Sequence, residues 1–157
     1  MSAWKRRLYR LALPLYRMAM RQVRGMTLGA RAIVLDGEGR VLLIEHSYTP
    51  GWHLPGGGVE SAETTEQAVV RELEEEGGIK VVGRATLVSV HSNGGSFKGD
   101  HVLLFRVETW TQVAATSRGE ILRAEWFHPH ELPEGTTGGV RRRIAEMLDG
   151  GPPDLFW

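Results

Sequence analysis

One stretch decides the fold of this chain: residues 57–79, which read GGVESAETTEQAVVRELEEEGGI. Glu72, Glu75 and Glu76 stand at positions i, i+3 and i+4, so a helix presents all three carboxylates on one face. Three like charges within one turn repel one another and destabilise an isolated helix. A divalent cation in front of this face removes the repulsion, and carboxylate oxygens suit Mg²⁺ or Mn²⁺. The stretch therefore predicts a helix that binds such a cation.

The same residues resemble the Nudix box, whose pattern is G-x5-E-x7-R-E-U-x-E-E-x-G-U with U a bulky aliphatic residue. The chain fills all nine constrained positions, with Gly57, Glu63, Arg71, Glu72, Leu73, Glu75, Glu76, Gly78 and Ile79. More loosely, the likeness extends over residues 28–149 as a domain pattern. The resemblance implies an α/β protein with the Nudix fold, an α/β/α sandwich with a mixed β-sheet. It also implies an enzyme that hydrolyses a pyrophosphate bond with the help of Mg²⁺.

Cleavage of a pyrophosphate needs neutralised phosphate oxygens, an in-line water molecule and a base that deprotonates this water. We interpret Glu75 and Glu76 as the central metal ligands. Glu72, one turn earlier, is either a third ligand or the general base. The resemblance favours the base for the first glutamate of R-E-U-x-E-E, and it implies the backbone carbonyl of Gly57 as a further ligand.

Arg71 and Glu63 are expected to orient these carboxylates. An arginine beside several glutamates can donate to two of them and fix their rotamers, although a plain surface ion pair is the alternative. The resemblance further implies a fourth carboxylate, catalytic or metal-binding, in the loop before the last strand. Glu120, six residues before Trp126, is the best match. Glu125 is the second choice, and either residue could be an ordinary surface acid.

Three residues outside the box are candidates for substrate contact. Trp52 precedes a run of glycines and could stack on a base or a sugar, although a tryptophan in such a place is more often a core residue. His53 and His91 could line the pocket. The six histidines are not spaced like metal ligands, so the alternative is that all of them are structural or surface residues.

The composition fits one globular domain: the chain has 157 residues, of which 41% are hydrophobic and 24% charged. It has no cysteine, which excludes disulfides and fits a reducing compartment, so we expect a cytoplasmic protein. Residues 1–31 hold eight basic and no acidic side chains, which leaves residues 32–157 with a net charge of −8. Such an acidic body argues against general nucleic-acid binding. The expected partner is a small phosphorylated molecule, a nucleotide above all.

We divide the chain into a basic amphipathic helix (residues 1–26), a Nudix domain (27–150) and a tail (151–157). In the predicted helix the arginines gather on one side, while Pro14 kinks or splits it. The helix either packs on the domain or on a second subunit, which would give a homodimer, or lies on an anionic membrane surface. An organelle transit peptide is a third, weaker interpretation.

Hydrophobic patterns predict the remaining elements. Strands are expected at residues 28–36, 40–46, 80–92, 101–110 and 122–128. A hairpin turn at residues 36–39 should join the first two strands. The box helix should begin near Ser61 as its N-cap and end at Gly77-Gly78, and a closing helix should span residues 140–148. This pattern alone supports only a mixed α/β domain.

The identity of the substrate stays open at this level. The box indicates a nucleoside diphosphate linked to another group, or a nucleoside triphosphate. One alternative is a nucleotide-sensing Nudix domain without turnover. Such domains often lose a box carboxylate, and this chain has lost none. The other alternative is a hydrolase that acts at a membrane on a diphosphate.

Overall fold

The computed structural model describes residues 25–157 except residues 97 and 118. The N-terminal helix predicted for residues 1–26 therefore lies almost wholly outside the described residues. The described elements are β1 (Thr27–Val34), β2 (Val41–His46), β3 (Trp52–His53), β4 (Gly56–Gly58), α2 (Thr65–Gly77), β5 (Ile79–Val81), β6 (Thr86–Ser92), β7 (Asp100–Val107), β8 (Trp110–Gln112), β9 (Ile121–Phe127) and α3 (Gly138–Asp149). No helix within residues 25–157 is long and apolar enough to cross a membrane.

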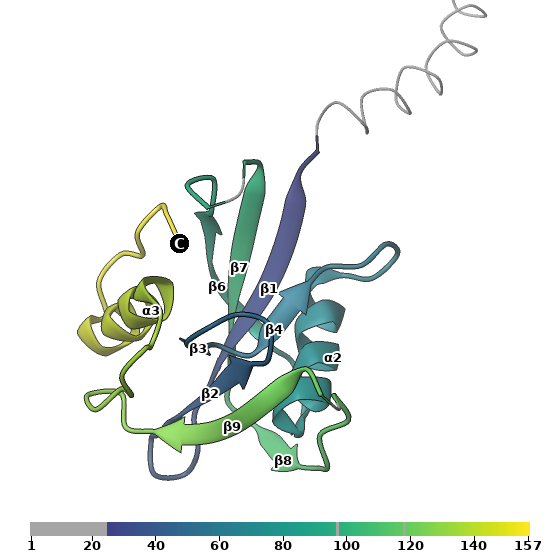
Figure 1. Ribbon diagram of the computed structural model, residues 1–157, viewed down its shortest axis with the longest axis vertical. Helices are drawn as coiled ribbons and strands as arrows, with labels where there is room; N and C mark the ends of the chain where they lie inside the picture. The colour runs from purple at the N-terminus through teal and green to yellow at the C-terminus, as the bar shows by residue number, and fades with distance from the viewer. Residues whose placement is uncertain (1–24, 97, 118) are drawn as a thin grey trace, which may run out of the picture.

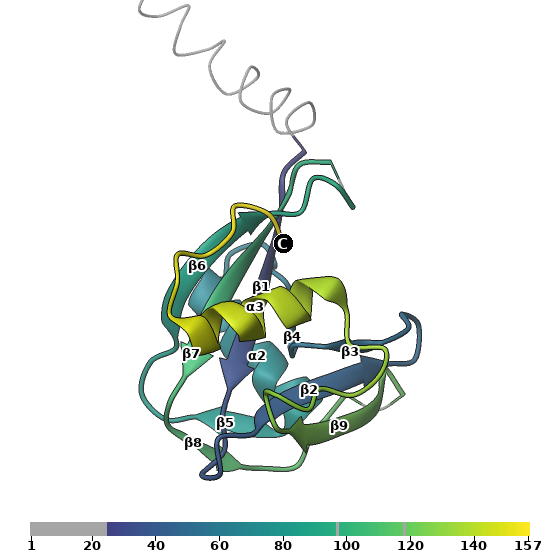
Figure 2. The same cartoon turned by 90° about the vertical axis from the view of Figure 1, so that its left-hand side faces the viewer.

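The central sheet has the strand order β4-β1-β7-β6, and α2 and α3 cover its opposite faces (Figures 1 and 2). β1 and β7 run parallel, while the other neighbours in this sheet are antiparallel. Ala68, Val69 and Leu73 of α2 pack on one face of the sheet. Val140 and Ile144 of α3 belong to a second cluster on the other face. The expected α/β/α sandwich with a mixed sheet is confirmed.

The predicted pairing of the first two strands is wrong. The turn exists, because Gly39 N–H donates to the carbonyl of Asp36 at 3.0 Å. Apart from a single bridge between Leu35 and Val41, however, β1 pairs with β7 and β4. β2 belongs to a second sheet, whose strand order is β3-β2-β9. β1 carries apolar residues toward both helices, so it is buried in the middle of the central sheet. If β1 paired with β2 instead, no strand would fill the place between β4 and β7 in the central sheet.

The predicted strand at residues 80–92 is in fact two strands. Gly83 has a φ of +89°, a conformation that breaks an extended strand and favours glycine. β5 therefore ends before it and β6 begins after it. The prediction at residues 101–110 likewise covers β7 and the start of β8, and β8 pairs with β5.

The box helix α2 starts later than expected, and Thr64 rather than Ser61 is its N-cap. The Thr64 hydroxyl accepts from the N–H of Gln67, whose side-chain oxygen accepts from the N–H of Thr64. This reciprocal pair is a capping box. Ser61 lies in the preceding turn, where Ala62 has a φ of +73°. Glu63 is consequently outside the helix, in the turn that leads into it.

Candidate active site

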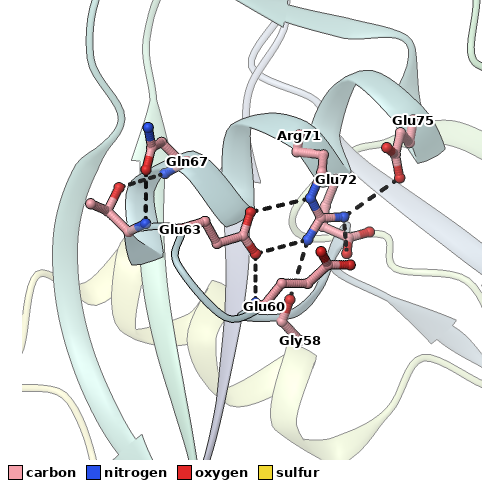
Figure 3. A network of polar contacts seen from close by, with 8 residues as sticks. Gly58, Glu60, Glu63, Gln67, Arg71, Glu72 and Glu75 are labelled. Atoms are coloured by element: carbon pink, nitrogen blue, oxygen red, sulfur yellow. Dashed lines mark hydrogen bonds and ion pairs between the residues drawn. The ribbon is translucent and has the colours of Figure 1, made fainter.

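Arg71 is the centre of a polar network between the box helix and the turn that precedes it (Figure 3). Its guanidinium donates to Glu63 at 3.0 Å and 3.3 Å and to Glu72 at 2.8 Å. It also donates to the carbonyl of Gly58 at 3.3 Å and lies 3.6 Å from Glu75. The hydrogen bond from Arg71 lowers the pKa of Glu63. One side chain thus fixes the helix carboxylates relative to the turn and to β4.

The carboxylates of Glu72 and Glu76 lie against the backbone of β4. The N–H of Gly56 donates to Glu76 Oε2 at 2.8 Å. The Glu72 carboxylate occupies the space where position 57 would carry a side chain, because a Cβ on Gly57 would lie 2.3 Å from Glu72 Oε1. This contact is possible only with glycine at position 57. The glycine strand therefore lets the helix bring two carboxylates to the edge of the sheet.

Glu76 is the most buried of the three helix carboxylates, with 8% of its side chain exposed. Burial, with smaller contributions from the charges of Glu72 and Glu120, raises its pKa to about 7. The N–H of Gly56 and the cation of Arg31 partly oppose this shift. The ionised form of Glu76 is therefore destabilised unless a further positive charge approaches it.

A cleft of about 660 Å³ opens beside the box. Its walls come from β1, β4, the loop between β6 and β7, the start of α3 and the C-terminal tail. The lining includes Thr27, Gly29, Arg31, His53, Gly57, Gly58, Asn93, Asp100, Gly139, Arg142 and Trp157. The volume suits a small ligand of nucleotide size.

Comparisons with known proteins agree with this geometry. The family model of the NUDIX domain matches residues 25–148. A "MutT-like protein" of Streptomyces ambofaciens is 34% identical over 123 residues, which are 78% of this chain and 77% of that protein. A Bacillus subtilis protein named "Putative 8-oxo-dGTP diphosphatase" is 32% identical over 124 residues, 79% of this chain and 81% of that protein. The crystal structure of a MutT NUDIX hydrolase from Burkholderia pseudomallei matches with a TM-score of 0.66 and 29% identity, covering 77% of this chain and 97% of that one.

The chain belongs to the NUDIX family. It is accordingly an enzyme of the pyrophosphohydrolase class. NUDIX enzymes in general act on phosphorylated nucleotide compounds and use divalent cations. The residues of the NUDIX box can therefore be compared with the needs of a bound cation.

The donor set of this NUDIX box fits a hard divalent cation. Its carboxylates offer only oxygen atoms, and a cation would stabilise the ionised form of the buried Glu76. In the part of the chain that the structure describes, no three acidic or histidine side chains stand in a ready-made metal cluster. Arg71 holds Glu72 and Glu75, while the Gly56 N–H holds Glu76. Mutual repulsion of the carboxylates favours these separate partners.

The loop before β9 brings Glu120 to the same side of the molecule as the NUDIX box. The backbone carbonyl of Glu120 accepts from the N–H of Ser47 at 2.8 Å. Burial raises the pKa of both Glu76 and Tyr48, and the negative charge of Glu120 adds a smaller contribution to each. Glu125, the second choice, lies exposed in β9 opposite Leu43. Glu120 is thus the better placed candidate for the fourth carboxylate.

The three candidates for substrate contact have different surroundings. His53 lines the cleft. Trp52 is a core residue: it is 5% exposed, packs edge-on against Phe127 at 4.9 Å and lies under the Arg123 guanidinium. The structural interpretation fits His91 as well, because its ring is fully buried and contacts the Ser89 hydroxyl and the carbonyl of Asp154, each at 2.7 Å. Neither Trp52 nor His91 lines the cleft.

Two residues near the NUDIX box were missed by sequence reasoning. Arg31 is partly buried in β1, lines the cleft and donates to the carbonyl of Leu54 at 3.0 Å. His46 is buried, and its Nδ1 lies 3.8 Å from Glu76. Burial, followed by the charge of Arg31, lowers the pKa of His46 to about 4, so its ring is neutral near pH 7. An arginine within an otherwise apolar strand was a usable signal, because charged residues are seldom buried without function or partner.

The contact between Gly57 and Glu72 yields a test with a matched control. We expect Gly57→Ala to displace the Glu72 carboxylate and to lower kcat by roughly ten- to a hundredfold, as loss of support around a metal site does. Gly37→Ala, in the turn before β2 and away from the cleft, meets nothing within 4 Å and should leave kcat nearly unchanged. Steady-state kinetics of both variants measure the difference. Equal rates would show that the position of Glu72 is not important.

Proposed function

We propose that this NUDIX enzyme hydrolyses a pyrophosphate bond in a nucleoside triphosphate, or in a nucleoside diphosphate linked to another group. The reaction is Mg²⁺-dependent, and water attacks phosphorus. One observation carries the proposal: the cleft of nucleotide size is lined both by the box strand, at Gly57 and Gly58, and by Arg31. Arg31 lines this cleft and is also within electrostatic reach of Glu76 and Glu72, so its cation links the cleft to the box carboxylates beside it.

Glu75 and Glu76 hold the cation in this proposal, together with the backbone carbonyl of Gly57 and with Glu120. Burial supports the assignment of Glu76, because its ionised form needs a neighbouring positive charge. Mg²⁺, when bound, neutralises the charge on the phosphate oxygens and lowers the pKa of a coordinated water. Mn²⁺ satisfies the same oxygen ligands.

Glu72 is proposed as the general base, and it remains a candidate third ligand. Its carboxylate lies beside Gly57 and accepts from Arg71 at 2.8 Å, a hydrogen bond that fixes its orientation. Arg71, itself held by Glu63, acts through Glu72 as an orienting residue. One guanidinium nitrogen of Arg31 donates to the carbonyl of Leu54, and the other N–H groups bind phosphate oxygens in this proposal. His53 lines the same cleft and contacts the substrate there.

A substrate screen tests the proposal. The wild-type chain is incubated with Mg²⁺ and with nucleoside triphosphates, 8-oxo-dGTP, nucleotide sugars, dinucleotides or ADP-ribose, and the phosphate products are identified. We place the triphosphates first because two relatives of similar length are a MutT-like protein and one named for 8-oxo-dGTP. Turnover should disappear when EDTA replaces Mg²⁺. If the whole panel binds without turnover, the sensor alternative replaces the enzymatic one.

A further inference from the structure

The last residues of the chain return to the central sheet and extend its edge (Figure 2). Ser92 at the end of β6 forms a parallel bridge with Phe156. The N–H of Ser92 donates to the carbonyl of Leu155 at 2.8 Å, and the N–H of Trp157 donates to the carbonyl of Ser92 at 3.0 Å. The tail is therefore bound by backbone hydrogen bonds of the kind that join two strands.

A fully buried arginine of α3 holds the tail in this position. Arg143 donates to the carbonyl of Phe156 at 3.0 Å and to Glu146 at 2.6 Å. Glu146 also accepts from the N–H of Asp154 at 2.9 Å. A buried cation is costly unless hydrogen bonds and a counter-charge surround it. Because the tail supplies one of these partners directly, the tail is an integral part of the domain.

The tail ends with an indole ring in the wall of the cleft. Trp157 lines the same cleft as Gly57 and Gly58 of the NUDIX box. Its ring lies so close to Gly139 that a Cβ there would be 2.5 Å from the indole Nε1. The Arg143 guanidinium lies 5.6 Å from the centre of the ring, which fixes the ring further. Trp157 is thus a partly buried, well-held aromatic surface.

We propose that Trp157 is the stacking surface for the base of the nucleotide substrate. The inference rests on the proposed function, because it names the residue that binds the base of a nucleotide whose phosphates occupy another part of the same cleft. The phosphates lie at Gly57, Gly58 and Arg31, and the aromatic group lies on Trp157. Every base has a π-face. An indole ring that is fixed in place can therefore stack on any base, whatever hydrogen-bond donors and acceptors that base carries.

Polar side chains in the same cleft add hydrogen-bonding groups for the edge of the base. Asn93 and Ser96 line the cleft from the loop between β6 and β7, and Asp100 lines it from the start of β7. Asn93 and Thr27 both donate to Asp100, at 2.8 Å and 2.6 Å, which fixes the orientation of its carboxylate. Stacking by Trp157 provides affinity for an aromatic group, and these side chains distinguish one base from another.

Binding measurements without metal and without a scissile bond test this assignment. The probes are the nucleoside 5′-monophosphates AMP, GMP, CMP and UMP, with ribose 5-phosphate as the probe that lacks a base. Titration calorimetry in EDTA compares the wild-type chain with Trp157→Phe and Trp157→Leu. We expect Trp157→Leu to weaken the best nucleotide on the order of tenfold, and Trp157→Phe to weaken it much less. Ribose 5-phosphate should bind all three proteins alike.

Phe156→Ala serves as the control within the tail, because Phe156 is 60% exposed, and this variant should bind like the wild type. Thermal unfolding of each variant reports whether the tail stays docked. The assignment is overturned if wild type prefers no nucleotide to ribose 5-phosphate, or if Trp157→Leu and Trp157→Phe bind nucleotides equally. The outcome is independent of catalysis. Base-dependent binding without turnover in the substrate screen would overturn the proposed function alone.

Discussion

Glu76→Gln is expected to lower kcat on the order of a thousandfold while the fold stays intact. Glutamine has the shape of glutamate, so it can keep the hydrogen bond from the N–H of Gly56. It has no negative charge, and the proposed cation site loses its most buried ligand. Steady-state turnover with Mg²⁺ measures the first effect, and calorimetric titration with Mn²⁺ measures the loss of metal affinity.

Glu74→Gln is the matched control for this experiment. Glu74 lies on the same helix, two residues away, and its side chain is exposed. The control removes one negative charge from α2 without touching the edge of β4, so its kcat should resemble that of the wild type. An unchanged rate in Glu76→Gln would refute the metal assignment, and an equal loss in both variants would indicate a general charge effect.

The second large effect is a pH dependence of stability that belongs to Glu76. Burial raises the pKa of this carboxyl to about 7 in the folded protein, against 4.5 for an ordinary glutamate. Between these values the folded chain holds a proton that the unfolded chain has lost. The free energy of unfolding therefore falls as the pH rises from about 4.5 to about 7, in EDTA, by up to about 3 kcal/mol.

His46 acts in the opposite direction and must be separated from Glu76. Its pKa is lowered to about 4 from 6.5, so its contribution to stability rises as the pH rises through this range. The useful quantity is the difference in unfolding free energy between the wild type and Glu76→Gln, since His46 is present in both. We expect the wild type to lose stability relative to the variant between pH 4.5 and pH 7.

Chemical denaturation in EDTA at several pH values measures this difference. Addition of Mg²⁺ at pH 8 should then stabilise the wild type and leave Glu76→Gln nearly unchanged, because a ligand that binds the folded state adds to stability. A pH-independent difference between the two proteins would show that Glu76 has an ordinary pKa. A stabilisation of both proteins by Mg²⁺ would place the cation elsewhere.

The sequence predicted the box network because its partners are close in the chain. Glu63 and Arg71 are eight residues apart, and the helix period alone places Glu72, Glu75 and Glu76 on one face. The start of the helix was also readable, since Thr64 and Gln67 have the spacing of a capping box. Ser61 is an equally good N-cap residue by type, so residue preference alone does not distinguish the two positions.

Long-range packing explains what the sequence did not predict. Arg31 and Glu76 come from separate segments that the pairing of β1 with β4 brings together, and a local pattern contains no such pairing. The burial of His91 depends on Arg143 and on the docked tail. The wrong hairpin has the same origin, because proximity in the chain favours β2 as the partner of β1 whereas burial on both faces favours β7.

The two ends of the cleft are built by different parts of the chain. The carboxylates beside the cleft come from α2 and their backbone support from β4. Much of the remaining wall is made by the loop between β6 and β7, the start of α3 and the tail. Substitutions in that wall can change which molecule is admitted while leaving the bond-breaking groups in place. Selection of substrate and cleavage of the bond can therefore evolve separately. A library of variants confined to residues 93–100 and 152–157 would test new substrates while the NUDIX box stays unchanged.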